Sequence, residues 1–252
     1  LPWNHSLATL FVMTENEPCT NTQRINSPEG CFALMHDANR WPQITEQQFS
    51  PSGYVDAQPV AGQGGRGGAW FVQTPVGPAV LKHYRRGGFL AKFVRSRYFF
   101  LGTMRTRGFQ EFQLLQSLLL KGLPVAKPLA AFCKRGLFSY QAALVTERIA
   151  NVHSLVIAAQ LSDAPWQRIG EVIAMFHRAG AQHSDLNANN ILINFSGDVF
   201  IIDWDKSKLK AAPGDWCETV LARLQRSLLK ECAHCDVQQL QQGITQMINA
   251  YQ

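Results

Sequence analysis

No apolar run in this 252-residue chain approaches the roughly 20 residues that a membrane-spanning helix requires. The N-terminus also has no basic segment followed by a small-residue cleavage site, so no secretory signal is apparent and a cytoplasmic protein is expected. Charged residues make up only 17% of the chain, but hydrophobic residues make up 46%, which argues against disorder. The length predicts one domain or two closely packed lobes.

Cysteines at regular paired spacings are also missing. The six cysteines are scattered, which indicates reduced thiols rather than a disulfide framework. Cys232, His234 and Cys235 have the spacing of half a zinc site, but no second CxxC or HxxxH pair completes four ligands. Zinc is therefore not the favoured interpretation.

Acidic residues are absent between Asp56 and Glu111, although the net charge of the whole chain is only +6. This acid-free interval should carry a strong positive potential, so its partner is expected to be anionic. ATP accounts for one or two of its charges, and an acidic substrate, nucleic acid or an anionic membrane surface could account for the rest. The basic residues are Arg66, Lys82, Arg85, Arg86, Lys92, Arg95, Arg97, Arg105 and Arg107.

Residues 183–205, HSDLNANNILINFSGDVFIIDWD, contain the most informative pattern. Two short apolar runs flank a Ser-Gly-Asp turn, which predicts a β-hairpin. Its outer ends carry Asp185 and Asn190 on one side and Asp203 on the other. Phosphoryl transfer needs these residue types: one Asp accepts the proton of the substrate hydroxyl, while Asn and the second Asp hold Mg²⁺ against the phosphates of ATP. The spacing resembles the catalytic loop and metal-binding motif of the protein-kinase-like fold.

Gly62, Gly64 and Gly67 match the pattern GxGxxG, which alone is weak evidence. A Rossmann unit would continue into a helix, but here two strand-like runs follow and the second ends in Lys82. This order is typical of the nucleotide-binding hairpin of kinases. Glycine lets backbone amides approach phosphates, and Lys82 is expected to reach the α- and β-phosphates.

The next predicted element is a helix from Glu111 to residue 120. A carboxylate on the inner face of this helix needs a cation, and we expect an ion pair with Lys82. The alternative is a helix N-terminal Glu that is favoured by the macrodipole. Two strands are predicted within residues 125–149, and backbone groups near Glu147 and Ile149 are expected to bind adenine.

The remaining chain is predicted to be mainly helical, with helices from about residue 165 to 180, 215 to 226 and 235 to 251. His177 is interpreted as a buried structural histidine. The predicted fold is α+β, a bilobal protein-kinase-like fold with a β-rich N-lobe (residues 27–148) and a small helical C-lobe (residues 149–252). Residues 1–26 are predicted to be a disordered or non-native tail.

Three departures from protein kinases concern the acceptor. Ser184 occupies the position of the arginine that pairs with a phosphorylated activation loop. Trp204-Asp205 replaces Phe-Gly, and the segment between Asp203 and the helix near residue 215 is short and contains no Ala-Pro-Glu. A platform for a protein substrate is therefore not expected, and a small or lipid-linked acceptor fits better.

Taken with these motifs, residues 55–230 resemble the bacterial 3-deoxy-D-manno-octulosonic acid (Kdo) kinases, a lipopolysaccharide kinase family. The resemblance is carried by LKHYRRGG at 81–88, GLPVAKP at 122–128, HSDLNANN at 183–190 and IDWDK at 202–206. It implies ATP-dependent phosphorylation of a hydroxyl of Kdo attached to lipid A, at the cytoplasmic face of the inner membrane. It also implies that Asp185 is the base, Asn190 and Asp203 bind Mg²⁺, and Lys82 with Glu111 clamps the phosphates.

The resemblance makes the anionic Kdo-lipid A the expected partner of the acid-free interval, rather than nucleic acid, and leaves the oligomeric state open. Arg85 and Arg86 are the candidates for contacting it. A basic and aromatic stretch follows, and either insertion into the membrane interface or core packing would account for it. Two other functions stay open: a kinase of another small molecule, such as a heptose or an aminoglycoside, and a nucleotide-binding scaffold. The aromatic residues are Phe89, Phe93, Tyr98, Phe99 and Phe100.

Overall fold

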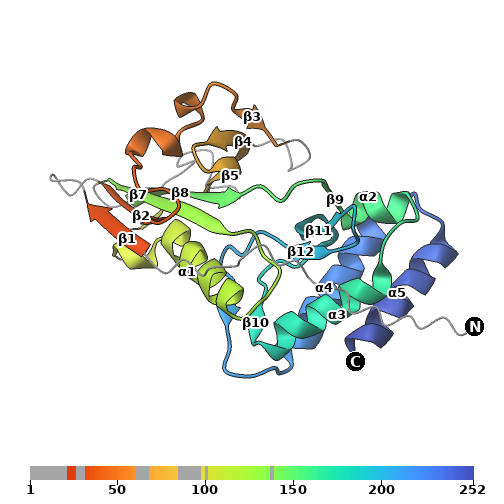
Figure 1. The fold of residues 1–252 in the computed structure, drawn as a ribbon. Helices are drawn as coiled ribbons and strands as arrows, with labels where there is room; N and C mark the ends of the chain where they lie inside the picture. The colour runs from red at the N-terminus through yellow and green to blue at the C-terminus, as the bar shows by residue number, and fades with distance from the viewer. Residues whose placement is uncertain (1–21, 27–31, 61–67, 85–97, 100–101, 137–138) are drawn as a thin grey trace, which may run out of the picture.

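The computed structural model describes residues 22–26, 32–60, 68–84, 98–99, 102–136 and 139–252. Within these ranges the fold combines mostly antiparallel sheets with five α-helices, in keeping with the predicted α+β class. A large sheet and helix α1 lie on one side of the molecule, and the other helices lie on the other side (Figure 1). The helices are α1 (Arg107–Leu120), α2 (Leu155–Gln160), α3 (Trp166–Arg178), α4 (Trp216–Glu231) and α5 (Val237–Tyr251).

The large sheet has the strand order β1-β2-β7-β8-β5-β4-β3, and β6 also pairs with β8. Every pairing is antiparallel. The predicted strands on either side of Lys82 are present, and Lys82 pairs with Ala69, the first residue of β4. The strands are β1 (Thr22–Asn26), β2 (Phe32–Asp37), β3 (Gln58–Pro59), β4 (Ala69–Thr74), β5 (Gly77–His83), β6 (Tyr98–Phe99), β7 (Pro128–Arg135) and β8 (Ser139–Glu147).

Helix α1 packs against β7 and β8 through an apolar stripe. Phe109, Phe112 and Leu118 are fully buried there, and burial of each such side chain contributes about 1.5–3 kcal/mol. Gly108 brings the helix close to β8, since a Cβ at this position would lie 2.7 Å from the carbonyl oxygen of Ala143. The first turn of α1 is therefore held closely against β8.

Two boundaries differ from the prediction. Thr22–Asn26, which we assigned to the N-terminal tail, forms β1 and pairs with β2, because backbone hydrogen bonding at a sheet edge does not require an apolar sequence pattern. Helix α1 begins at Arg107 rather than Glu111. The prediction began the helix at its first acidic residue, whereas the contact between Gly108 and β8 extends it by one turn.

The predicted hairpin of residues 191–202 is present as β11 (Ile191–Asn194) and β12 (Val199–Ile201). The Asn194 side chain shapes its turn by accepting hydrogen bonds from the N–H groups of Ser196 and Asp198, at 3.0 and 2.8 Å. Strand β9 (Val152–Ser154) completes this small sheet, and β10 (Ala181–Gln182) pairs with β13 (Lys208–Leu209). Short 3-10 helices lie at Glu46–Phe49, Pro51–Gly53, Thr103–Arg105 and Ala188–Asn190.

His177 joins α3 to the end of α5. Its Nδ1 atom lies 2.8 Å from the Tyr251 hydroxyl, and its ring packs edge-on against Trp216, with ring centroids 5.0 Å apart. The side chain is buried, as predicted for a structural histidine. Burial lowers the pKa of His177 from 6.5 to about 4.

We expect this histidine to make folding stability sensitive to acid. Because the folded-state pKa is below the ordinary value, its stabilisation is complete above about pH 6.5 and is lost as the pH falls towards 4. This lowering of the pKa corresponds to a loss of about 3 kcal/mol. Urea unfolding between pH 7 and pH 4 should show the loss in the wild type and a smaller loss in His177→Gln.

His234→Gln is the matched control, because His234 is exposed and its replacement should leave the wild-type pH dependence intact. Parallel stability curves for the wild type and His177→Gln over this range would contradict the assignment.

None of the helices in the described ranges has both the length and the apolar character that crossing a membrane requires.

Candidate active site

Lys82, near the end of β5, contacts two carboxylates from distant parts of the chain. Its Nζ atom lies 3.0 and 2.9 Å from the two carboxylate oxygens of Glu111 on α1, and 2.5 Å from Oδ1 of Asp203. Burial acts to lower the pKa of Lys82, but the charges and hydrogen bonds of both carboxylates outweigh it and raise the pKa. The predicted ion pair with Glu111 is therefore present, and the ammonium group is charged.

Tyr84, two residues after Lys82, contacts both Lys82 and Glu111. Its hydroxyl donates a hydrogen bond of 2.7 Å to Glu111, and the Lys82 Nζ atom lies 5.0 Å from the centre of its ring. Burial, followed by the charge of Glu111, raises the pKa of Tyr84 well above its ordinary value, so the hydroxyl stays a donor. Glu111 is itself only 4% exposed, and its charge is balanced by these two partners.

The outer ends of the β11–β12 hairpin meet as predicted. The N–H of Ile202 donates a hydrogen bond of 3.0 Å to the carbonyl oxygen of Asn190, one residue beyond the last paired residues of the two strands. Asn190 is buried, and its side-chain nitrogen donates to the backbone carbonyl of Asp185 at 3.0 Å. This bond orients the amide, so the Asn190 side-chain oxygen is the atom that could coordinate a cation.

His183 braces the same loop. Its Nε2 atom lies 3.0 Å from the carbonyl oxygen of Ile202, and its Nδ1 accepts from the N–H of Asp185 at 3.1 Å. Burial lowers its pKa despite the hydrogen bond to Ile202, so the neutral ring donates at Nε2 and accepts at Nδ1. The ring thus fixes the backbone of Asp185 relative to the strand that leads to Asp203.

Asp185 presents its carboxylate to the solvent side of this loop. Its Oδ1 atom accepts a hydrogen bond of 2.8 Å from the guanidinium of Arg223, on α4. Asn187 also donates from its side chain to the carbonyl oxygen of Asp185, at 3.1 Å. The candidate base is therefore held by its backbone and remains accessible at its carboxylate.

Asp203 adopts a left-handed backbone conformation with φ of 62°, which is uncommon for a residue other than glycine and often marks a functional site. Burial opposes its ionisation, but Lys82 outweighs this effect through its charge and hydrogen bond, and the pKa of Asp203 is lowered. Asp203 is therefore a carboxylate held close to a cation. Together with Asn190 it offers the hard oxygen atoms that Mg²⁺ prefers.

The two residues that replace Phe-Gly have distinct contacts. Trp204 is 1% exposed and stacks on Phe176 of α3, with ring centroids 5.1 Å apart, while its indole N–H donates to Ile201. Asp205 forms an ion pair with Arg107, at the start of α1, including a hydrogen bond of 2.6 Å from Nε. Trp204 anchors the Asp203 loop in the core, and Asp205 ties the same loop to α1.

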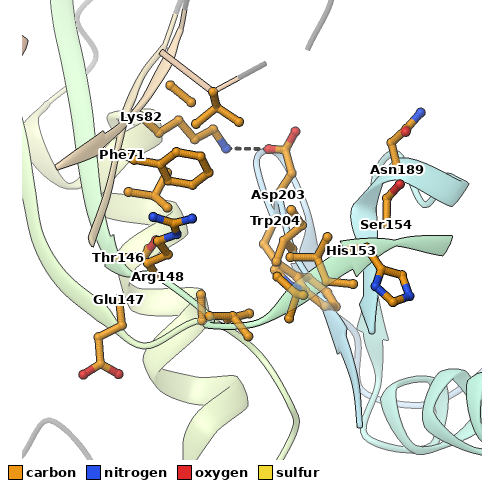
Figure 2. Close-up of a pocket in the computed structure, with 18 of the residues that line it drawn as sticks. Phe71, Lys82, Thr146, Glu147, Arg148, His153, Ser154, Asn189, Asp203 and Trp204 are labelled. Atoms are coloured by element: carbon orange, nitrogen blue, oxygen red, sulfur yellow. Dashed lines mark hydrogen bonds and ion pairs between the residues drawn. The ribbon is translucent and has the colours of Figure 1, made fainter. Parts of the chain in front are cut away.

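A cavity of about 620 Å³ opens beside this cluster. It is lined by residues of the large sheet and α1 on one side and by residues between 149 and 204 on the other. Lys82 and Asp203 contact each other at one wall of the cavity, Arg148 and Phe71 lie on the sheet side, and Asn189 lies on the opposite side (Figure 2). Glu147 and Ile149 also line it. The Glu147 side chain points away in Figure 2 and pairs with Arg40, so only its backbone could serve a ligand there.

Several predicted site residues lie outside the described residues. They are Gly62, Gly64, Gly67, Arg85 and Arg86, together with most of the aromatic stretch. Tyr98 and Phe99 form β6, which pairs with β8. The described residues contain no group of three or more His, Cys, Asp and Glu side chains placed to hold a metal ion.

Sequence analysis missed four residues of this site: Tyr84, Arg107, Asp205 and Arg223. Strand and helix periodicity could have suggested two of them, since Tyr84 follows Lys82 by two residues and Arg107 precedes Glu111 by four. Asp205 was noticed only as a departure from Phe-Gly. Arg223 gives no signal, because it is one of several charged residues on an amphipathic helix.

Comparison with known proteins agrees with the chemistry of these residues. A family model described as the lipopolysaccharide kinase (Kdo/WaaP) family matches residues 55–251. The chain is 47% identical over 203 residues to a 3-deoxy-D-manno-octulosonic acid kinase of Xanthomonas campestris pv. campestris (strain B100), which covers 80% of this chain and 82% of that protein. A protein of the same name from Xanthomonas oryzae pv. oryzae (strain PXO99A) is 46% identical over the same shares.

A third relative with that name, from Stenotrophomonas maltophilia (strain R551-3), is 42% identical over 224 residues, 88% of this chain and 90% of that protein. The matched region contains every described residue of the Lys82 cluster and of the loop around Asp185. On the extent of the family match and the identity to these relatives, the chain belongs to the lipopolysaccharide kinase (Kdo/WaaP) family.

Proposed function

We propose that this chain transfers the γ-phosphoryl group of ATP to a hydroxyl of a Kdo sugar attached to lipid A. The three relatives above are named as Kdo kinases, over four fifths or more of this chain. The observation that carries the proposal is the contact of Lys82 with both Glu111 and Asp203. It brings a cation suited to phosphate and a carboxylate suited to a metal ion to one wall of a cavity large enough for a nucleotide.

In this proposal the two parts of the molecule are the lobes of a protein-kinase-like fold. The sheet with α1 is the N-lobe, predicted as residues 27–148, and residues 149–252 form the C-lobe. Adenine lies against the backbone carbonyl of Glu147 and the N–H of Ile149. The N–H of Ile149 suits this role because it makes no backbone hydrogen bond with a described residue, whereas the N–H of Arg148 is bonded to Pro78.

The proposed phosphate contacts are Lys82 and, from the sequence pattern, the glycines at positions 62, 64 and 67. Glu111 keeps the lysine extended towards them, and Tyr84 keeps Glu111 in place. Asn190 and Asp203 would hold Mg²⁺, which supplies positive charge to the β- and γ-phosphates during transfer. Two protein oxygen ligands suit this ion, since it usually retains water and phosphate oxygens as its other ligands.

Asp185 accepts the proton of the acceptor hydroxyl as the new oxygen–phosphorus bond forms and ADP leaves. Its carboxylate is accessible, while its backbone is fixed by His183 and Asn190. Ser184 binds the adjacent segment through neutral hydrogen bonds to Asp205 and Ser207. The short segment of residues 204–215 leaves little room for a peptide platform, which favours a sugar acceptor.

The acceptor is strongly anionic, and the acid-free interval is suited to it. We propose that the enzyme works at the cytoplasmic face of the inner membrane, where this interval contacts the acceptor and anionic lipids. Arg85 and Arg86, which follow Lys82 by three and four residues in the sequence, are the proposed acceptor contacts.

Arg85→Ala and Arg86→Ala are each expected to raise KM for the lipid-linked sugar and to leave KM for ATP unchanged. A guanidinium bound to a carboxylate or phosphate contributes about 1.5–3 kcal/mol when buried and less when solvated. Steady-state kinetics at low and high salt measure both effects, because screening should weaken acceptor binding more in the wild type than in either variant. Unchanged acceptor KM in both variants at low salt would place the acceptor site elsewhere.

The decisive experiment is incubation of the purified protein with ATP and Kdo-bearing lipid A, with the product analysed by mass. A mass gain of one phosphate on the Kdo sugar is expected. Heptose-bearing lipopolysaccharide and an aminoglycoside are the comparison acceptors, and phosphorylation of one of these instead of Kdo would overturn the proposal. ATP binding without transfer to any acceptor would favour a scaffold.

A further inference from the structure

The candidate base is paired with a cation that its own loop does not supply. Residues 185–190, DLNANN, contain no Lys or Arg, although the loop lies where two anions, the phosphoryl group and the acceptor, are proposed to meet. A positive charge at the Asp185 carboxylate therefore has to come from outside this loop. In the structure it comes from Arg223, whose Nη1 atom lies 2.8 Å from Oδ1 of Asp185.

Helix α4 places this arginine through contacts on the same face. Leu224 and Leu228 are fully buried and fix the helix in the core. Ser227, one turn after Arg223, accepts a hydrogen bond of 3.1 Å from the N–H of Ala188 in the Asp185 loop. The guanidinium thus stands beside the loop because the helix is docked onto it, and its placement does not depend on the ion pair alone.

The pair itself is poorly suited to a purely stabilising role. The side chains of Arg223 and Asp185 are 45% and 63% exposed. Ion pairs with this exposure typically contribute only about 0–1 kcal/mol to folding. Moreover, one hydrogen bond uses one of the five N–H donors of a guanidinium, and its planar fork is well matched to a second carboxylate.

We propose that Arg223 binds the carboxylate of the acceptor sugar and so places the reacting hydroxyl beside Asp185. This inference rests on the proposed function and names the group by which that site would recognise an acid sugar. Without a cation there, the carboxylates of the acceptor and of Asp185 would repel each other when the hydroxyl approaches the base. Arg223 offsets this repulsion by lying between two negative charges, and a neutral sugar would gain nothing from it.

The test compares Arg223→Gln with the wild type on Kdo-bearing lipid A and on the same acceptor with its sugar carboxylate converted to an amide. With the native acceptor, Arg223→Gln should raise KM about tenfold or more, as expected for a lost charged hydrogen bond, with a smaller change in kcat. With the amide, the variant and the wild type should have similar acceptor KM. Arg223→Lys should recover part of the affinity.

Arg226→Gln is the matched control, because Arg226 is an exposed arginine on the same helix. It should match the wild type with both acceptors. An acceptor with the lipid A phosphates removed separates the two sources of negative charge: the Arg223→Gln effect should persist on it, and its disappearance would assign Arg223 to those phosphates and overturn the inference.

Two other results would also overturn it. An unchanged acceptor KM in Arg223→Gln would show that the residue does not bind the acceptor. A raised KM for ATP, or slower ATP hydrolysis without acceptor, would assign it to the transferred phosphoryl group. A wild-type protein that cannot phosphorylate Kdo-bearing lipid A would contradict the proposed function together with this inference, whereas an active wild type with an unaffected variant contradicts only the inference.

Discussion

Asp185→Asn is expected to lower kcat by about 10²- to 10⁴-fold, the usual contribution of general acid–base catalysis. The amide has nearly the same shape as the carboxylate but cannot accept the proton of the acceptor hydroxyl. The backbone of residue 185 should stay in place, since its contacts with His183 and Asn190 do not involve the side chain. Binding of Mg²⁺-ATP should therefore remain close to that of the wild type.

Single-turnover transfer to Kdo-bearing lipid A measures the chemical step, and titration with Mg²⁺-ATP measures nucleotide binding. Asp163→Asn is the control, because it removes an exposed carboxylate outside the cavity. A variant that retains more than about a tenth of the wild-type kcat would contradict the role of base, given the size of this contribution in other enzymes. A large loss of nucleotide affinity would instead indicate that Asp185 helps to bind the metal-nucleotide complex.

Asp203→Ala should impair both nucleotide binding and turnover. Asp203 is hydrogen-bonded to Lys82 and is ionised, so its removal takes away a proposed metal ligand and a partner of the lysine together. We expect kcat/KM for ATP to fall by about 10²-fold or more, in the range seen when one group that stabilises transition-state charge is lost. Lys82 should keep its position through Glu111.

Titration with ATP at increasing Mg²⁺ concentration distinguishes the two aspartates. For Asp203→Ala, higher Mg²⁺ should partly restore nucleotide affinity, whereas Asp185→Asn should show no such dependence. Asp163→Asn again serves as the control. Wild-type dependence on Mg²⁺ in Asp203→Ala would remove Asp203 from the proposed metal site.

The parts of the site that sequence reasoning reached share one property: their geometry is set by local structure. A hairpin between residues 191 and 201 brings Asn190 and Asp203 to the same end, and β5, which contains Lys82, is positioned by the tight turn that joins it to β4. The ion pair of Lys82 and Glu111 could be predicted from the sequence for a second reason. A carboxylate on the buried face of a helix requires a cation, and the order of elements offered one candidate.

The contacts that were not predicted join segments far apart in sequence through exposed or half-buried charges. Arg107 and Asp205 are separated by 98 residues, and Arg223 and Asp185 by 38. Many other arginines and aspartates in the chain carry charges that could pair in the same way. Only the packing of α1 and α4 determines which of them come together. The strand β1 was missed for a related reason, because an edge strand depends on the backbone of its neighbour.

The ion pair of Arg107 with Asp205 has a consequence for how α1 can move. Arg107 and Glu111 are four residues apart on α1, which corresponds to a rise of about 6 Å. Arg107 forms an ion pair with Asp205, and Glu111 forms one with Lys82. Since each residue turns the helix by about 100°, both ion pairs can form together at only one rotational orientation of α1. The helix therefore sets the spacing between Lys82 in the sheet and Asp205 in the Asp203 loop. A rotation of α1 would disturb both ion pairs together, so we expect the catalytic cluster to separate as a single unit.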